Sequence, residues 1–97
     1  MRIIAKRTLR EFWEKRPDCK EQLKAWHGEV QAADWSSPAN VKAKFGSASI
    51  LKNGRVVFNI CGNKYRLIAW INFDFKIVYI RFIGSHKKYD KVDAENI

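Results

Sequence analysis

The sequence predicts an α+β domain in which N-terminal helices pack on one face of a small antiparallel sheet. The first observation is a switch in apolar spacing, from a helical period before Gly46 to a period of two after Ile50. The second is the length of 97 residues, which supports one domain, and no repeat or linker divides residues 1–97. Helices followed by a run of strands are typical of a two-layer α+β architecture.

Capping signals and a proline predict three helices in the first half of the chain. Thr8-x-x-Glu11 and Asp18-x-x-Glu21 are capping boxes, which predict helices that begin at Thr8 and Asp18. Ser37-Pro38 predicts a third helix, because proline is favoured at the first helical position. The apolar faces of these helices are formed by the following residues: Leu9, Phe12, Trp13, Leu23, Trp26, His27, Val30, Val41 and Phe45.

Alternation of apolar and polar residues predicts strands over residues 55–60, 64–73 and 76–84, in addition to a short first strand at Arg2–Ala5. Each of the three longer strands has one apolar face and one mixed face that carries a cation. The apolar faces are formed by the following residues: Val56, Phe58, Ile60, Tyr65, Leu67, Ala69, Ile71, Phe73, Val78, Ile80 and Phe82.

Two predicted hairpin loops, Gly62-Asn63 and Asp74-Phe75, set the strand registers. The first loop pairs Asn59 with Arg66, and the second pairs Arg66 with Ile83. Both registers place apolar residues beside apolar residues, which a slip of one residue would not do. Arg81 is then expected on the same face as Arg66, at a diagonal distance of roughly 7–8 Å. The mixed face is therefore expected to collect four polar side chains: Arg55, Asn59, Arg66 and Arg81.

The positive charge is concentrated in one part of the chain. The sequence holds 19 Lys and Arg against 10 Asp and Glu, a net charge of +9. Residues 42–91 contain eleven of these cations and only two anions, Asp74 and Asp90, so this stretch carries the whole excess. A basic half joined to a nearly neutral half indicates a surface that binds a polyanion such as nucleic acid. The alternative is a solvated surface, because Lys and Arg are common on any protein surface.

Composition excludes several other classes of protein. Apolar residues make up 46% of the chain and aromatic residues 13%, which is typical of a globular domain and not of a disordered basic tail. No apolar run approaches the roughly 20 residues needed to cross a bilayer. The amino end becomes charged too soon for a signal peptide, so a cytoplasmic protein is expected. Cys19 and Cys61 are in no metal-ligand spacing, and neither a metal nor another cofactor is predicted.

The segment Arg81–Asp90 carries the candidate catalytic groups. His86 and Tyr89 are three residues apart and would share a face of a helical turn, while Asp90 is placed to orient the histidine ring. A neutral imidazole suits proton transfer near pH 7, and arginines stabilise charge that develops on a phosphorane. This combination suits metal-independent RNA cleavage, in which the 2′-hydroxyl attacks the adjacent phosphorus and leaves a 2′,3′-cyclic phosphate. The alternative is that His86 has no catalytic role and is an ordinary exposed histidine beside two lysines.

Two segments together resemble the HigB toxins, which belong to the RelE superfamily of bacterial type II toxin–antitoxin systems. Phe58–Ile68 is similar to the motif F-N-x-G-G-N-x-x-R, and Ile80–Asp90 is similar to an arginine followed by the ending [T/S]-H-x-x-Y-D. The resemblance implies the small RelE-like fold and an mRNA interferase that cuts messages on the translating ribosome. It also implies a HigA antitoxin as the neutralising partner, with operator DNA bound only through the antitoxin complex.

The resemblance and the charge distribution together assign the candidate residues. Arg66 and Arg81 are predicted to bind the scissile phosphate, and His86 is predicted to act as base or acid. The predicted catalytic residues are His86, Arg66, Tyr89, Arg81 and Asp90. The predicted RNA-binding residues are Asn59, Asn63, Lys64, Lys87 and Lys88. Cys61 departs from the family motif, in which this position is glycine.

Two other functions remain open on the sequence. The first is a non-catalytic module that binds RNA or the ribosome with the same basic face. The second is a regulatory DNA-binding subunit, which is less favoured because the nearly neutral helical half shows no basic recognition helix. Among the aromatic residues, Trp13, Trp26 and Trp35 are expected in the core, whereas Trp70 on the mixed face is the one placed to stack on a base.

Overall fold

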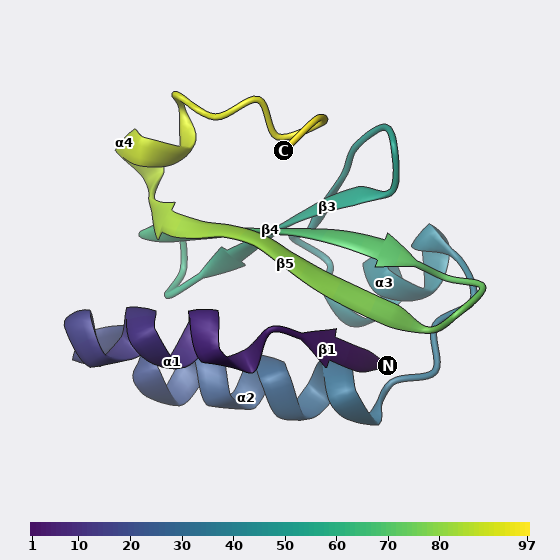
Figure 1. Ribbon diagram of the computed structural model, residues 1–97, viewed down its shortest axis with the longest axis horizontal. Helices are drawn as coiled ribbons and strands as arrows, with labels where there is room; N and C mark the ends of the chain where they lie inside the picture. Colours follow the sequence, from purple (N-terminus) through teal and green to yellow (C-terminus); the bar gives the residue numbers. More distant parts are fainter.

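The computed structural model describes residues 1–97 and confirms the α+β class (Figure 1). One five-stranded sheet has the strand order β1-β5-β4-β3-β2. The edge pair β1–β5 is parallel and the other pairs are antiparallel, so the sheet is mixed and not fully antiparallel as expected. The elements are β1 (Arg2–Ile4), α1 (Lys6–Lys15), the 3-10 helix η1 (Pro17–Cys19), α2 (Lys20–Ala32), α3 (Pro38–Lys44), β2 (Ser49–Ile50), β3 (Arg55–Ile60), β4 (Tyr65–Asn72), β5 (Ile77–Ser85) and α4 (His86–Tyr89).

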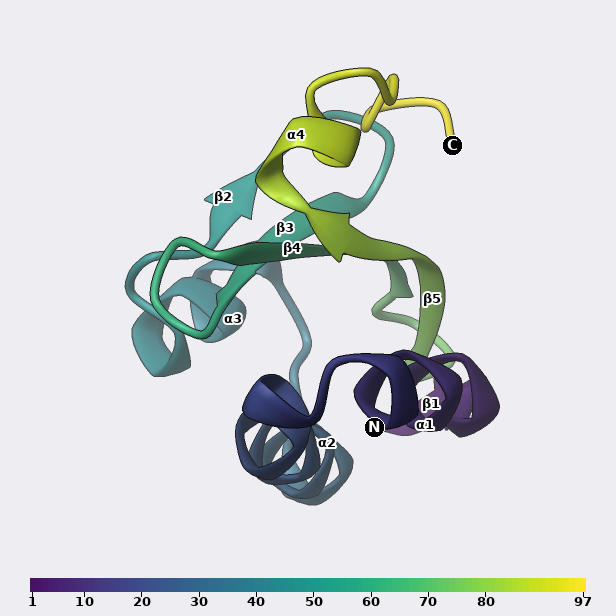
Figure 2. The ribbon, with the colours of Figure 1, turned by 90° about the vertical axis from the view of Figure 1, so that its left-hand side faces the viewer.

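The two faces of the sheet are covered differently (Figure 2). Helices α1 and α2 lie along one face, while α4 and the C-terminal segment lie over the other. We call these the helix-covered face and the α4 face. The core fills the helix-covered face, where Phe58 of β3 and Leu67 of β4 meet Leu9 and Leu23, all almost fully buried. Trp26 packs edge-on against Phe58, with ring centroids 5.2 Å apart. None of the helices is both long and apolar enough to span a membrane.

Neither predicted capping box forms, although both of the helices that they predict are present. Helix α1 begins at Lys6, two residues before Thr8, and its N-cap makes no side-chain hydrogen bond. Glu11 instead accepts a hydrogen bond from Arg7 at 2.8 Å, one turn earlier on the same helix. Asp18 lies in η1 and does not cap α2, because its carboxylate binds Lys64 of the β3–β4 loop and Tyr65 of β4. The expected start of the third helix is confirmed, with Pro38 at the first helical position.

The predicted register of β3 and β4 is confirmed, because Asn59 pairs with Arg66. The strand pairing ends at Ile60 and Tyr65, one pair earlier than predicted, although the Lys64 amide still donates to the Cys61 carbonyl at 3.2 Å. Cys61 has a φ of 56°, a left-handed conformation that costs a non-glycine residue about 1 kcal/mol or more. The glycine of the family motif would avoid this cost.

The predicted register of β4 and β5 is correct only near their connecting loop. Ala69 pairs with Ile80, but its neighbour Ile68 pairs with Phe82, so Arg81 is an extra residue without a partner in β4. Such a bulge shifts every later pair by one residue. Sequence alternation does not reveal it, because the residues on both sides of the bulge are apolar and fit either face.

The bulge reverses two expected orientations at the end of β5. Arg66 lies opposite Gly84 and not opposite Ile83. Ile83 pairs with Leu67 and packs against the core, whereas Phe82 leaves the apolar face to which the alternation assigned it. A Cβ atom at Gly84 would lie only 2.8 Å from the Phe82 ring, so a larger residue here would require this ring to shift.

Candidate active site

Helix α4 follows β5 without a loop and presents the predicted catalytic groups at the end of the sheet. Ser85 is the N-cap residue, and its Oγ accepts a hydrogen bond from the Lys88 amide at 3.3 Å. His86 and Tyr89 therefore lie on one turn, with ring centroids 6.3 Å apart and planes inclined by 67°. The predicted helical turn is confirmed over His86–Tyr89.

Asp90 lies beside the histidine, as the spacing predicts. Its Oδ2 is 3.5 Å from Nδ1 of His86, and both side chains are about half exposed. A carboxylate next to Nδ1 favours the tautomer with the proton on that nitrogen. Nε2 then carries the free lone pair, and no side chain of the protein binds it. The geometry therefore leaves Nε2 available to accept a proton from a ligand.

Arg66 completes this group from the neighbouring strand. Its guanidinium carbon lies 5.7 Å from the centroid of the Tyr89 ring, a cation–π contact that links β4 to α4. Nη1 of Arg66 is buried and has no hydrogen-bond partner. A buried N–H without an acceptor is costly, and an anionic ligand would satisfy it. We call Arg66, His86, Tyr89 and Asp90 the α4 cluster.

Arg81 does not join the α4 cluster in the way its predicted register required. In the observed register Gly84 lies opposite Arg66, and Arg81 comes three residues before Gly84. Arg81 is therefore one residue further from Arg66 along β5 than the predicted diagonal position. Its side chain is exposed, and no hydrogen bond or ion pair restrains it. Its role at the phosphate therefore stays a prediction, whereas the diagonal register is wrong.

Two of the predicted RNA-binding residues are bound within the protein. Nζ of Lys64 lies 2.6 Å from Asp18 Oδ2, and this hydrogen bond lowers the pKa of the Asp18 carboxyl and raises the pKa of the Lys64 ammonium. The Tyr65 hydroxyl donates to the same carboxylate at 3.1 Å. Asn59 donates to the Ser47 carbonyl at 3.3 Å. We call Asp18, Lys64 and Tyr65 the Asp18 network. The remaining three predicted residues, Asn63, Lys87 and Lys88, are exposed and form no ion pair.

The far end of the α4 face is occupied by the protein itself. Arg55 donates to the carbonyl of Ile97 at 2.7 Å and to that of Asn53 at 2.8 Å, which fixes the C-terminal segment over this face. The Trp70 ring stacks on Tyr79, with centroids 4.9 Å apart and planes within 20°. Trp70 therefore already stacks on a ring of the chain itself, and two N–H groups of Arg55 are bound to carbonyls.

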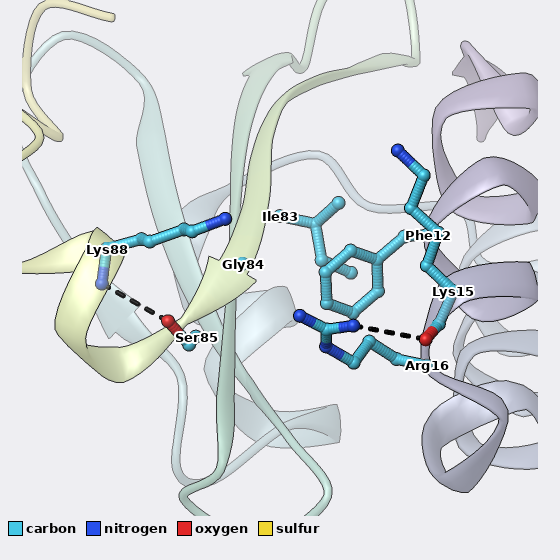
Figure 3. Close-up of a pocket in the computed structure, with 7 residues that line it drawn as sticks. All are labelled: Phe12, Lys15, Arg16, Ile83, Gly84, Ser85 and Lys88. Carbon is cyan, nitrogen blue, oxygen red and sulfur yellow. Dashed lines mark hydrogen bonds between the residues drawn. The ribbon is translucent and has the colours of Figure 1, made fainter.

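Sequence reasoning missed two basic residues that lie near the α4 cluster. Lys15 and Arg16, at the end of α1, line a cavity beside Ser85 and Lys88 (Figure 3). Their charge was counted with the nearly neutral half of the chain, and no local signal in the sequence brings them to β5. The buried thiol of Cys19 has a pKa raised to about 11 by desolvation, which makes it unreactive. No three His, Cys, Asp or Glu side chains gather as a metal site.

Comparisons with known proteins agree with the motifs. The family model HigB_toxin, described as the RelE-like toxic component of a toxin–antitoxin system, matches residues 19–92. The chain is 33% identical over 92 residues to the mRNA interferase toxin HigB of Escherichia coli (strain K12), and the match covers 93% of this chain and 88% of that protein. It is 31% identical over 94 residues to the mRNA interferase HigB of Escherichia coli O6:H1, covering 95% and 91%.

Proposed function

Because the chain belongs to the HigB family of RelE-like toxins, we propose that it is an endoribonuclease that cleaves mRNA and so inhibits translation. Relatives that it matches over about nine-tenths of its length are named mRNA interferases, which supports this activity. The observation in the chain itself that carries the proposal is the α4 cluster. It combines a buried guanidinium N–H without a partner and an imidazole with a free Nε2.

The chemistry of this cluster suits cleavage by the 2′-hydroxyl of the RNA. Nε2 of His86 accepts the 2′-hydroxyl proton, and the oxygen attacks the adjacent phosphorus. The bond from phosphorus to the 5′ oxygen then breaks, and that oxygen takes up a proton from solvent. The products are a 2′,3′-cyclic phosphate and a 5′-hydroxyl end. Arg66 stabilises the negative charge that develops on the phosphorane, and no metal ion takes part.

The other candidate residues hold the substrate or the histidine. Asp90 keeps the His86 ring in the reactive tautomer, and Tyr89 orients both the histidine and the Arg66 guanidinium. Arg81, exposed in its bulge, contacts the scissile phosphate as a second guanidinium beside Arg66. The flanking backbone is bound by the remaining predicted residues: Asn59, Asn63, Lys64, Lys87 and Lys88.

The proposed partners follow from the family. The substrate is mRNA on the translating ribosome, in the cytoplasm, and a HigA-type antitoxin neutralises the protein. Operator DNA is bound only through the antitoxin complex. A comparison of naked RNA with RNA on translating ribosomes tests the first part, because ribosome-dependent cleavage predicts cuts only in the second sample. Restored growth on co-expression of a HigA-type protein tests the second.

Growth and RNA mapping test the activity together. Induced wild-type protein is expected to stop growth and to leave messages with cyclic-phosphate ends, whereas His86→Ala and Arg66→Ala permit growth. Lys20→Ala removes an exposed cation outside the proposed site and is expected to remain toxic. Cleavage of purified ribosome–mRNA complexes in EDTA tests the absence of a metal.

Undiminished toxicity of both active-site variants would remove the proposed site. Arrested translation with intact messages would instead support a non-catalytic module that binds RNA or the ribosome.

A further inference from the structure

A second basic site lies beside the α4 cluster, between the end of α1 and the junction of β5 with α4 (Figure 3). This cavity has a volume of about 180 Å³. Three cations line it, two from α1 and its C-cap and one from α4: Lys15, Arg16 and Lys88. We call it the α1–α4 cavity. It is separate from the α4 cluster, none of whose four residues lines it.

The charges of the α1–α4 cavity are not neutralised within the protein. No acidic residue lines it, and none of its three cations forms an ion pair. Arg16 is held at the helix end by a hydrogen bond from its Nη1 to the Lys15 carbonyl at 3.1 Å. Arg16 and Lys88 extend toward each other from α1 and from α4 in Figure 3. Cations gathered in this way repel one another, and an anion between them relieves that repulsion.

The remaining lining residues suit a phosphate group. The Ser85 Oγ accepts the Lys88 amide, so its own O–H is free to donate to a ligand. The Phe12 ring and Ile83 form an apolar wall, which strengthens nearby polar contacts by excluding water. The cavity volume of about 180 Å³ is large enough for one phosphate group.

We propose that the α1–α4 cavity is a second phosphate subsite, which holds a backbone phosphate of the RNA strand next to the scissile one. This inference rests on the proposed function. Ser85 and Lys88 line the cavity, while His86 between them belongs to the α4 cluster. His86 and Lys88 belong to the same turn of α4, so the cavity lies within one helical turn of the α4 cluster. This proximity favours the cleaved strand as the ligand over an acidic protein segment.

The subsite is tested by binding of an RNA that cannot be cleaved. A single-stranded 2′-O-methyl oligonucleotide is titrated against the full chain at several salt concentrations. Lys15→Ala/Arg16→Ala is expected to bind about tenfold more weakly, and the slope of log affinity against log salt is expected to fall by about 0.7, the value for one phosphate on a single strand. The matched control Arg10→Ala/Lys20→Ala removes two exposed cations outside the cavity and outside the basic half of the chain, and is expected to retain the wild-type slope.

The outcomes separate this inference from the proposed function. An unchanged affinity and slope in Lys15→Ala/Arg16→Ala would overturn the subsite, even if His86→Ala abolishes cleavage. A weakened RNA affinity would support the subsite even if the wild-type protein cleaved nothing. Unchanged RNA binding with weakened binding of an acidic antitoxin peptide would also overturn it, by assigning the cavity to a protein. Circular dichroism of each variant confirms that the loss does not arise from unfolding.

Discussion

Neighbouring residues of β4 show how differently the two faces of the sheet are used. Leu67 points to the helix-covered face and is completely buried, while Arg66 points to the α4 face and is only half-buried. The first face is closed by α1 and α2, which bury the apolar surface that stabilises the fold. The second leaves an arginine N–H without a partner. A residue that stabilises the fold and a residue proposed to bind the ligand are therefore neighbours on a single strand.

The charged groups at this end of the sheet divide in the same way. In the Asp18 network, a carboxylate, an ammonium and a hydroxyl satisfy one another. In the α4 cluster, Asp90 approaches His86, but no carboxylate reaches Arg66. Both groups are built around cations that flank Tyr65 in the sequence, Lys64 and Arg66. The Asp18 network neutralises its own charges, whereas the α4 cluster keeps a cation without a counter-charge that can bind an anion.

The strongest test of this division is Arg66. Replacement by alanine is expected to lower the rate of RNA cleavage by about 10²–10³-fold, because a donor to the developing charge is lost. Lysine is expected to restore part of the rate, since it keeps the charge but not the planar fork of donors. Cleavage by equal amounts of folded protein is the measurement. A large fall in Tm with a preserved rate would show that Arg66 is structural and would contradict the comparison.

Leu67→Ala is expected to have the opposite effects, a large one on stability and a small one on cleavage. Removal of a fully buried side chain beneath α1 and α2 is expected to lower the free energy of unfolding by about 3 kcal/mol. The rate of cleavage per folded molecule is expected to change little. Urea denaturation measures the first quantity, and cleavage well below the midpoint of unfolding measures the second. A loss of rate in the folded protein would show that the two faces are not independent.

The sequence is sufficient to predict the pairing of two strands where only one register buries the apolar residues. Between β3 and β4, a slip of one residue would expose Phe58 and Leu67, so the pairing of Asn59 with Arg66 could be predicted. Beyond the bulge, Phe82 and Ile83 are both apolar, so alternation does not distinguish their faces and the shift at Arg81 was missed. The α4 turn, in contrast, depends on spacing over five residues and was found.

Long-range contacts account for most of the other features that the sequence did not predict. The second capping box failed because Asp18 binds Lys64 and Tyr65, more than forty residues away, and not the start of α2. The same holds for Arg16, whose position near Ser85 depends on how α1 packs beside β5. A helical cation is assigned to a site only when the tertiary structure brings it there.

Tyr65→Phe is expected to produce a smaller effect, on stability alone. It removes one hydroxyl that donates to the Asp18 carboxylate at 3.1 Å, and one such hydrogen bond contributes about 1 kcal/mol. The ring remains to pack edge-on against Phe12, so no cavity forms. Urea denaturation is expected to show this fall, with RNA cleavage unchanged. A loss of cleavage would instead extend the active site into the Asp18 network.

The smallest expected effect is a pH dependence that arises from the same network. The Lys64 hydrogen bond lowers the pKa of Asp18 below its usual 3.8, so the carboxylate is favoured in the folded state. Its contribution to stability is therefore present above pH 3.8 and is lost as the pH falls through the lower, folded pKa. Because Asp18 and Lys64 are both exposed, the contribution is small.

Asp18→Asn keeps an acceptor for the Tyr65 hydroxyl and removes only the charge. Its Tm is expected to lie slightly below that of the wild type at pH 7, and this difference is expected to shrink below pH 3.8. A double-mutant cycle with Lys64→Gln isolates the pair, because the two changes are non-additive only if the charges interact. A Tm difference that persists unchanged into acid would show that packing and not charge holds η1 against the sheet. The Asp18 network would then be held together by packing and not by its charges. The contrast with the unpaired charge of Arg66 would depend on the α4 cluster alone.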